Sequence, residues 1–107
     1  MRFLMFVMGD ETPDAEPDES DVDVWVDELE SAGQRVIGDI LDPGTARGVR
    51  VRAGETIVSE GPLVGVTDAI WGVDLLEARD LDEATALAAR HPMARNGRLE
   101  LRPFPED

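Results

Sequence analysis

The chain opens with a nearly unbroken apolar run, RFLMFVM at residues 2–8, which stops at Gly9-Asp10. Apolar runs of this length, bounded by turn residues, are typical of strands that are buried on both faces in the middle of a sheet. The run is too short for the apolar core of a signal peptide, and no later stretch reaches the length of a membrane span. We therefore expect a central β-strand in a cytoplasmic protein without a membrane partner.

Two segments have the apolar spacing of amphipathic helices. The first follows Ser20, which we interpret as the start of a capping box, and it ends near Gly33. The second covers residues 80–92, with acidic residues in its first turn and Pro92, which requires the helix to stop by His91. The predicted apolar stripes are Val22, Trp25, Val26 and Leu29 in the first helix, and Leu81, Ala84, Leu87, Ala88 and His91 in the second.

Three further segments predict strands of the same sheet. Residues 34–41 and 70–78 are mainly apolar runs of strand length. Near the end of the chain, Leu99 and Leu101 alternate with polar residues, after a predicted turn at residues 95–98. Each of these segments follows or precedes a predicted helix.

A hairpin is predicted between these strands. Residues 48–52 alternate between apolar and charged side chains, residues 55–59 return as their partner strand, and Ala53-Gly54 closes the turn. The alternation places Val49 and Val51 on one side. We expect that side to face the core.

The order of the predicted elements is strand, helix, strand, hairpin, strand, helix and strand. Apart from the hairpin, this is the order of the split βαβ motif. We therefore expect an α+β fold, a ferredoxin-like split βαβ with an inserted β-hairpin, in a single domain over residues 1–107. The acidic stretch at residues 10–19 contains two prolines and is predicted to be a solvated loop.

Charge and composition exclude several classes of function. The 24 acidic and 10 basic residues give a formal net charge of -14, so nucleic acid is repelled. The chain has no cysteine and no lysine, which excludes disulfides, thiolate nucleophiles and Schiff bases. The acidic segment lacks the order of ligands and glycine of an EF-hand, so we predict no metal site and no cofactor.

Three segments together resemble a known family. They are the strand that ends in Gly9-Asp10, the hairpin strand that ends in Glu60-Gly61-Pro62-Leu63, and the closing block LLEARDLDEATALAARHPMARNGRLELRPF. In this order and at these separations they are similar to the YCII-related proteins, in particular to the branch that contains the DGPF motif. The resemblance covers nearly the whole chain.

The resemblance implies a ferredoxin-like subunit that pairs with a copy of itself, so that two sheets meet in a dimeric α/β barrel with a cleft on each subunit. The family's biochemical role is unsettled, and some members are encoded beside or fused to extracytoplasmic-function sigma factors. The chain departs from the family at Leu63, where the motif has phenylalanine, and at Trp71, where the common sequence is Gly-Gly-aromatic. It also lacks the histidine that YCII proteins often carry in the first helix, so a His-Asp mechanism is not carried over.

His91 is the only histidine of the chain and the main candidate for chemistry. An imidazole titrates near neutral pH without any perturbation, which suits a proton shuttle. A structural role is equally natural, because an imidazolium interacts favourably with a helix C-terminus and a neutral ring packs against the apolar stripe. Both roles stay open at this point.

Four other positions are candidates for the site or an interface. Asp10 follows a strand and is a candidate catalytic base, although Gly-Asp after a strand more often forms a turn with its own backbone. Trp71 and Glu60 are candidate ligand-binding residues, and a core or interface anchor is the alternative for the tryptophan. Residues 61–63, Gly-Pro-Leu, predict a rigid corner at the dimer interface, because the proline fixes one dihedral angle and the glycine allows close backbone approach.

Two functional hypotheses follow. The first is a small-molecule enzyme or binder whose cleft is lined by Asp10, Trp71 and His91, with an isomerase-like or lyase-like step as the expected chemistry. The second is a non-catalytic accessory module that binds a protein partner such as a transcription factor. Both hypotheses expect a homodimer.

Overall fold

The computed structural model describes residues 1–14 and 19–106, and its main body is a four-stranded antiparallel sheet. The strands are β1 (Arg2–Gly9), β2 (Arg35–Ile40), β5 (Ile70–Glu77) and β6 (Gly97–Pro103), in the spatial order β2-β5-β1-β6. This order, with β1 and β5 in the centre, is that of a ferredoxin-like fold, as predicted.

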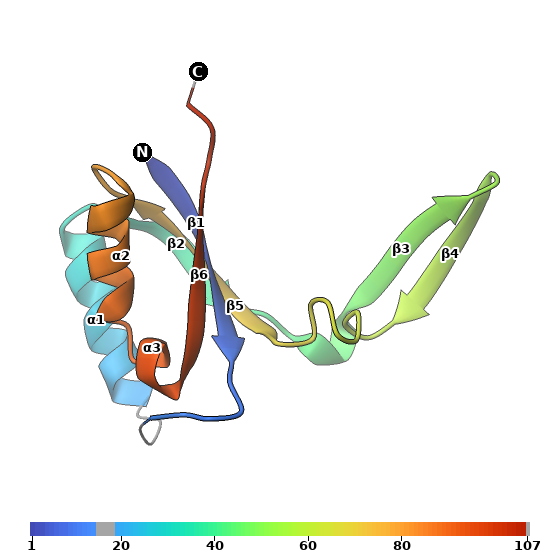
Figure 1. The fold of residues 1–107 in the computed structure, drawn as a ribbon, viewed down its shortest axis with the longest axis horizontal. Coiled ribbons are helices and arrows are strands. Elements are labelled where there is room, and N and C mark those ends of the chain that lie inside the picture. Colours follow the sequence, from blue (N-terminus) through green and yellow to red (C-terminus); the bar gives the residue numbers. More distant parts are fainter. Residues whose placement is uncertain (15–18, 107) are drawn as a thin grey trace.

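Three helices accompany this sheet. They are α1 (Glu19–Ser31), α2 (Leu81–Ala89) and the short α3 (Met93–Asn96), and Figure 1 shows α1 and α2 together on one face. The helix α1 begins before Ser20, so this residue lies inside the helix rather than at the predicted cap. The helix α3 and the start of β6 at Gly97 replace the predicted turn at residues 95–98, because the chain forms one more helical turn after Pro92.

The core lies between the helices and the sheet. The stripe of α1 is confirmed, since Trp25 and Leu29 are buried, and the indole Nε1 of Trp25 donates a hydrogen bond of 2.9 Å to the carbonyl oxygen of Leu87 in α2. Each large apolar side chain that is buried in this way stabilises the fold by roughly 1.5–3 kcal/mol. The predicted stripe of α2 is wrong at Leu81, which is about half exposed because it lies in the first turn, beyond the edge of the core.

The strand β1 is central, as predicted, but it is not buried on both faces. Phe3 and Met5 are fully buried beneath the helices, whereas Leu4 and Phe6 point to the opposite face and are only half-buried. Among the described residues no helix covers that second face. The sheet therefore has one packed face and one open face.

The inserted hairpin forms a separate two-stranded sheet of β3 (Arg47–Arg52) and β4 (Glu55–Glu60). Figure 1 shows it projecting away from the main body. The Ala53-Gly54 turn is confirmed, with positive φ values of 51° and 80°, as a two-residue hairpin turn requires. The prediction that Val49 and Val51 face the core is wrong: they are 66% and 56% exposed, because no helix or strand among the described residues packs extensively on the hairpin.

A short 3-10 turn connects β2 to the hairpin. It covers Pro43–Thr45, and the carboxylate of Asp42 accepts a hydrogen bond of 2.8 Å from the backbone N–H of Gly44. This confirms the turn predicted at Asp42-Pro43-Gly44. None of the described helices is long and apolar enough to cross a bilayer.

Candidate functional site

His91 lies directly after α2 and points into the interior. Its residue is 4% exposed, and its Nδ1 accepts a hydrogen bond of 2.9 Å from the backbone N–H of Met93. Because Nδ1 uses its lone pair in this bond, the neutral ring carries its proton on Nε2. A second proton on Nδ1 would face the Met93 N–H, so this geometry disfavours the imidazolium.

The electrostatic surroundings act in the same direction. Burial lowers the pKa of His91 from its ordinary value, and the positive charge of Arg35 lowers it further, while the negative charge of Asp74 opposes both. The net result is a depressed pKa. His91 is therefore a neutral imidazole at pH 7.

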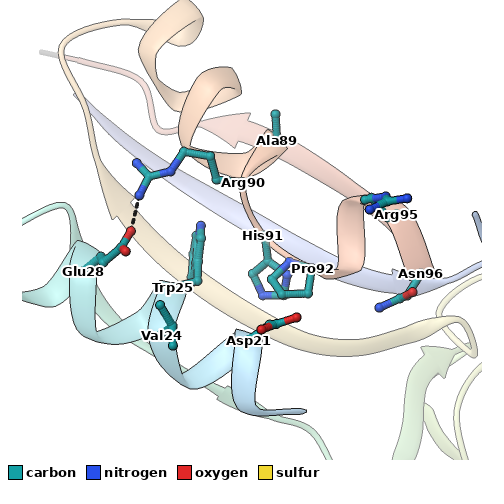
Figure 2. Close-up of a pocket in the computed structure, with 10 residues that line it drawn as sticks. All are labelled: Asp21, Val24, Trp25, Glu28, Ala89, Arg90, His91, Pro92, Arg95 and Asn96. Carbon is teal, nitrogen blue, oxygen red and sulfur yellow. Dashed lines mark hydrogen bonds and ion pairs between the residues drawn. The ribbon is translucent and has the colours of Figure 1, made fainter. Parts of the chain in front are cut away.

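Two hollows meet at the segment that contains His91. The larger one has a volume of about 660 Å³ and lies among α1, β2, β5 and the start of α3. The smaller one, of about 410 Å³, lies between α1 and residues 89–96, as Figure 2 shows. Three residues, His91, Pro92 and Asn96, line both hollows. We call the larger hollow the cavity.

The floor of the cavity holds a buried ion pair. The Nε of Arg35 donates a hydrogen bond of 2.7 Å to Oδ1 of Asp74, and the same guanidinium also pairs with Glu30. Burial alone would lower the pKa of Arg35, but the two carboxylates more than offset it, so this pKa is raised. Asp74 is 6% exposed, which makes it one of two buried polar or charged residues together with His91 among those described.

The backbone of β2 makes room for this pair. A Cβ atom on Gly38 would lie 2.2 Å from Oδ1 of Asp74 and 2.7 Å from the carbonyl oxygen of Val73. No side chain fits at such distances. Gly38 is thus required for the position of the Asp74 carboxylate.

Trp71 forms part of the cavity wall at the start of β5. The pairing of β1 with β5 shifts register between Val7 and Met8, and this irregularity lies beside Trp71. The indole covers Gly9, where an added Cβ would lie 2.3 Å from a ring carbon. A glycine at position 9 therefore allows the indole to reach this place.

The structure brings two of the four predicted site residues together. His91 and Trp71 both line the cavity. Asp10 does not line it, and the Asp10 carboxylate accepts hydrogen bonds from the backbone N–H and the hydroxyl of Thr12, at 3.2 and 3.4 Å. This is the turn that the sequence offered as its alternative. Glu60 is also elsewhere, at the base of the hairpin.

The corner after β4 uses the conformational freedom of its glycine. Gly61 has a φ of +84°, and its N–H donates a hydrogen bond of 2.8 Å to the carbonyl oxygen of Ala46. The side chain of Leu63 occupies the space beside Gly48, where an added Cβ would lie 2.7 Å from it. Glu60 forms an exposed ion pair with Arg47 across the two strands, which fits a structural role at the base of the hairpin.

Sequence reasoning missed the buried ion pair of the cavity, Asp74 and Arg35, and also the exposed Asp23 and Asp39 that line it. Asp74 lies in the apolar stretch IWGVDLL, at the position whose side chain points to the helices, as Leu76 does. A carboxylate at a strand position that points to the core could have predicted a buried ion pair, because a buried charge needs a partner. No group of three or more histidine, cysteine or acidic side chains within residues 1–14 and 19–106 is placed to hold a metal ion.

The sequence as a whole matches a known family. The family model described as the YCII-related domain matches residues 1–105. The chain belongs to the YCII-related family. A search of curated proteins found no match to it. In this YCII-related chain the single histidine lies in the HP segment after α2, and the buried carboxylate on the same cavity, that of Asp74, belongs to the central strand β5.

Proposed function

We propose that this YCII-related domain binds a small molecule in the cavity and that His91 donates a hydrogen bond to it. The observation that carries the proposal is the hydrogen bond from the Met93 N–H to Nδ1 of His91, which leaves a neutral ring with its proton on Nε2. No described residue accepts a hydrogen bond from Nε2. The ring is therefore prepared to donate to an oxygen of a ligand.

A neutral, donating imidazole supports one kind of chemistry well. Such a ring polarises a carbonyl group and stabilises the negative charge that develops on its oxygen during proton abstraction, as in isomerases. The proton-shuttle role that the sequence suggested for His91 stays a prediction. The hydrogen bond at Nδ1 favours the donor role, because a shuttle has to accept and release a proton in turn.

A fragment screen by ¹H–¹⁵N NMR tests the binding function. We expect hits that shift the indole N–H signal of Trp71 and the signals around His91, with smaller effects on Trp25. In the Trp71→Ala variant these hits should bind several-fold more weakly, while Val66→Ala, an exposed change outside the cavity, should bind normally. A screen whose hits all map outside the cavity contradicts the proposal.

We also propose that the protein is a homodimer that uses the open face of its sheet. Half-buried apolar side chains of β1 and β5 lie on this face, and Ile37 of β2 is 67% exposed there. The radius of gyration of 15.8 Å exceeds the roughly 13 Å of a compact chain of this length, owing to the projecting hairpin. Covering both the face and the hairpin with a second copy would bury this apolar surface.

The dimer also keeps the second functional hypothesis open. An accessory module would bind a protein partner through the acidic surface, or through the part of the hairpin that the second copy leaves uncovered. The cytoplasm is the proposed location. Native mass spectrometry separates the two functions. A dimer that retains a small mass supports the binding function, whereas a bare dimer that captures no fragment in the cavity supports the accessory role.

A further inference from the structure

The charged groups around the cavity are mostly negative. Asp23, Asp39 and Asp74 line it, against a single guanidinium, that of Arg35. This guanidinium is already paired with Asp74 and Glu30. The neutral ring of His91 adds no positive charge at pH 7. An anionic ligand would find no unpaired cation among the described residues that line the cavity.

Two acceptor oxygen atoms of residues on the cavity have no described hydrogen-bond partner, and one of them, Oδ1 of Asn96, is buried. Oδ1 of Asp74 accepts from Arg35, but no described residue donates to its second oxygen, Oδ2. Oδ1 of Asn96 is fully buried and has no hydrogen-bond partner among the described residues. Buried acceptors are normally satisfied, so the orphan oxygen of Asn96, on the same cavity as the open carboxylate oxygen of Asp74, indicates a donor supplied from outside the chain.

The rest of the lining is largely apolar. Val7, Val26 and Met93 contribute aliphatic and thioether surface, and the indole of Trp71, about half exposed, forms one wall. An indole attracts both flat apolar groups and cations, because its face carries negative electrostatic potential. The cavity thus combines acceptors and negative charge with a broad apolar wall.

From these three observations we propose that the cavity takes an organic cation, an ammonium group or protonated nitrogen base attached to a flat apolar body. The cationic N–H groups bond to Oδ2 of Asp74, and to Oδ1 of Asn96 once that side chain turns toward the cavity, and the apolar body packs against Trp71. An oxygen of the ligand, where present, accepts from His91. This inference rests on the proposed binding function and names the class of its ligand.

Three probes of equal shape test the charge. They are 2-phenylethylamine, 2-phenylethanol and 3-phenylpropanoate, which share one phenyl ring and a two-carbon chain but carry a positive, a neutral and a negative group. Each is titrated into the protein at pH 7 and moderate salt, with the Trp71 indole and the Asn96 side-chain amide followed by NMR. We expect the amine to bind about tenfold more tightly than the alcohol and the acid to bind weakest.

A pair of variants separates the cavity from the general negative charge of the chain. Asp23→Asn and Asp27→Asn remove the same charge from exposed positions one turn apart in α1, but only Asp23 lines the cavity. We expect Asp23→Asn to weaken amine binding about threefold and Asp27→Asn to leave it nearly unchanged. Equal losses in both variants would show non-specific attraction and overturn the inference.

The outcomes also separate this inference from the proposed function. If the alcohol or the acid binds the cavity as tightly as the amine, the cationic class is wrong while the cavity remains a binding site. If no probe shifts Trp71 or Asn96 at millimolar concentration, the inference fails. The broader fragment screen then decides whether the binding function fails with it.

Discussion

The imidazole of His91 lies edge-on to the indole of Trp25, with ring centroids 4.6 Å apart and an angle of 65° between the ring planes. The indole is itself fixed by its hydrogen bond to Leu87, so α1 and α2 together determine how the imidazole is oriented. Edge-to-face pairs of this kind stabilise a fold by roughly 0.5–1.5 kcal/mol beyond the burial of the two rings. The ring that lines the cavity is therefore also part of the core.

This double role predicts a measurable loss of stability on removing the ring. His91→Ala leaves a hole beside Trp25 and deprives the Met93 N–H of its acceptor, so we expect the free energy of unfolding to fall by about 2–4 kcal/mol. Urea unfolding followed by tryptophan fluorescence measures it. Arg90→Ala, which removes an exposed pair with Glu28, is the matched control and should cost at most about 1 kcal/mol.

The depressed pKa of His91 predicts a pH dependence of stability. The unfolded chain takes up a proton near pH 6.5, the ordinary value for histidine, whereas the folded chain does so only at lower pH. The contribution of the neutral ring is therefore complete above pH 6.5 and is lost as the pH falls toward the folded pKa. From unfolding curves, the free energy of unfolding of the wild type should decline between pH 7.5 and pH 5, and His91→Gln should reduce this decline. An equal decline in both proteins would contradict the assignment of the depressed pKa to His91.

The ion pair of Asp74 and Arg35 predicts a strong asymmetry between single and double changes. Asp74→Leu leaves a largely buried guanidinium without its buried partner and should destabilise the protein by about 3 kcal/mol. Changing both residues to leucine removes both charges and should cost less than the single change. The set of variants is completed by the second single change, Arg35→Leu. Chemical denaturation of the wild type, the two single variants and the double variant gives the coupling energy between the two residues. Additive losses would show that the pair acts as two independent residues.

The contact between Gly9 and Trp71 predicts a local displacement. An alanine at position 9 would place its methyl group on the indole, so Gly9→Ala should push the Trp71 ring away from its present position in the cavity wall. We expect the NMR signal of the Trp71 indole N–H to move and fragment binding to weaken, while the unfolding midpoint changes little. Gly33→Ala serves as a control for backbone strain alone, because nothing lies near its Cβ position.

The corner after β4 tests the dimer. Leu63→Asp places a charge beside Gly48 at the base of the hairpin, and we expect it to weaken or abolish dimerisation. Val64→Asp, which alters the neighbouring and more exposed residue, should leave the dimer intact. Native mass spectrometry or sedimentation measures the fraction of dimer in each variant. A stable dimer in the Leu63→Asp variant would remove this corner from the interface.

The sequence was sufficient to predict the fold because its signals are local. The spacing of Trp25 and Leu29 identifies the buried side of α1 without knowledge of any other segment, and Pro92 gives the end of α2 to within a few residues. The position of His91 after this helix follows from the same signal. The alternation around Val49 predicted a strand correctly but not its burial, because whether a face is covered depends on other elements.

The ion pair shows why the site was harder to predict. Asp74 and Arg35 are 39 residues apart in sequence and meet through the pairing of β2 with β5. That pairing contains a register irregularity between Arg35 and Ile37, which a period-two pattern does not reveal. The tautomer of His91 likewise depends on a hydrogen bond from Met93, in a short helix that was expected to be a turn.

The hairpin of β3 and β4 shares little of the core that holds the rest of the chain together. Substitutions along its valine face therefore change what the hairpin contacts while costing the main body little stability. The fold of the main body therefore tolerates changes in this segment that it does not tolerate at the ion pair or at the glycines around the cavity. Descendants of this chain can change their associations without first gaining extra stability to tolerate the change.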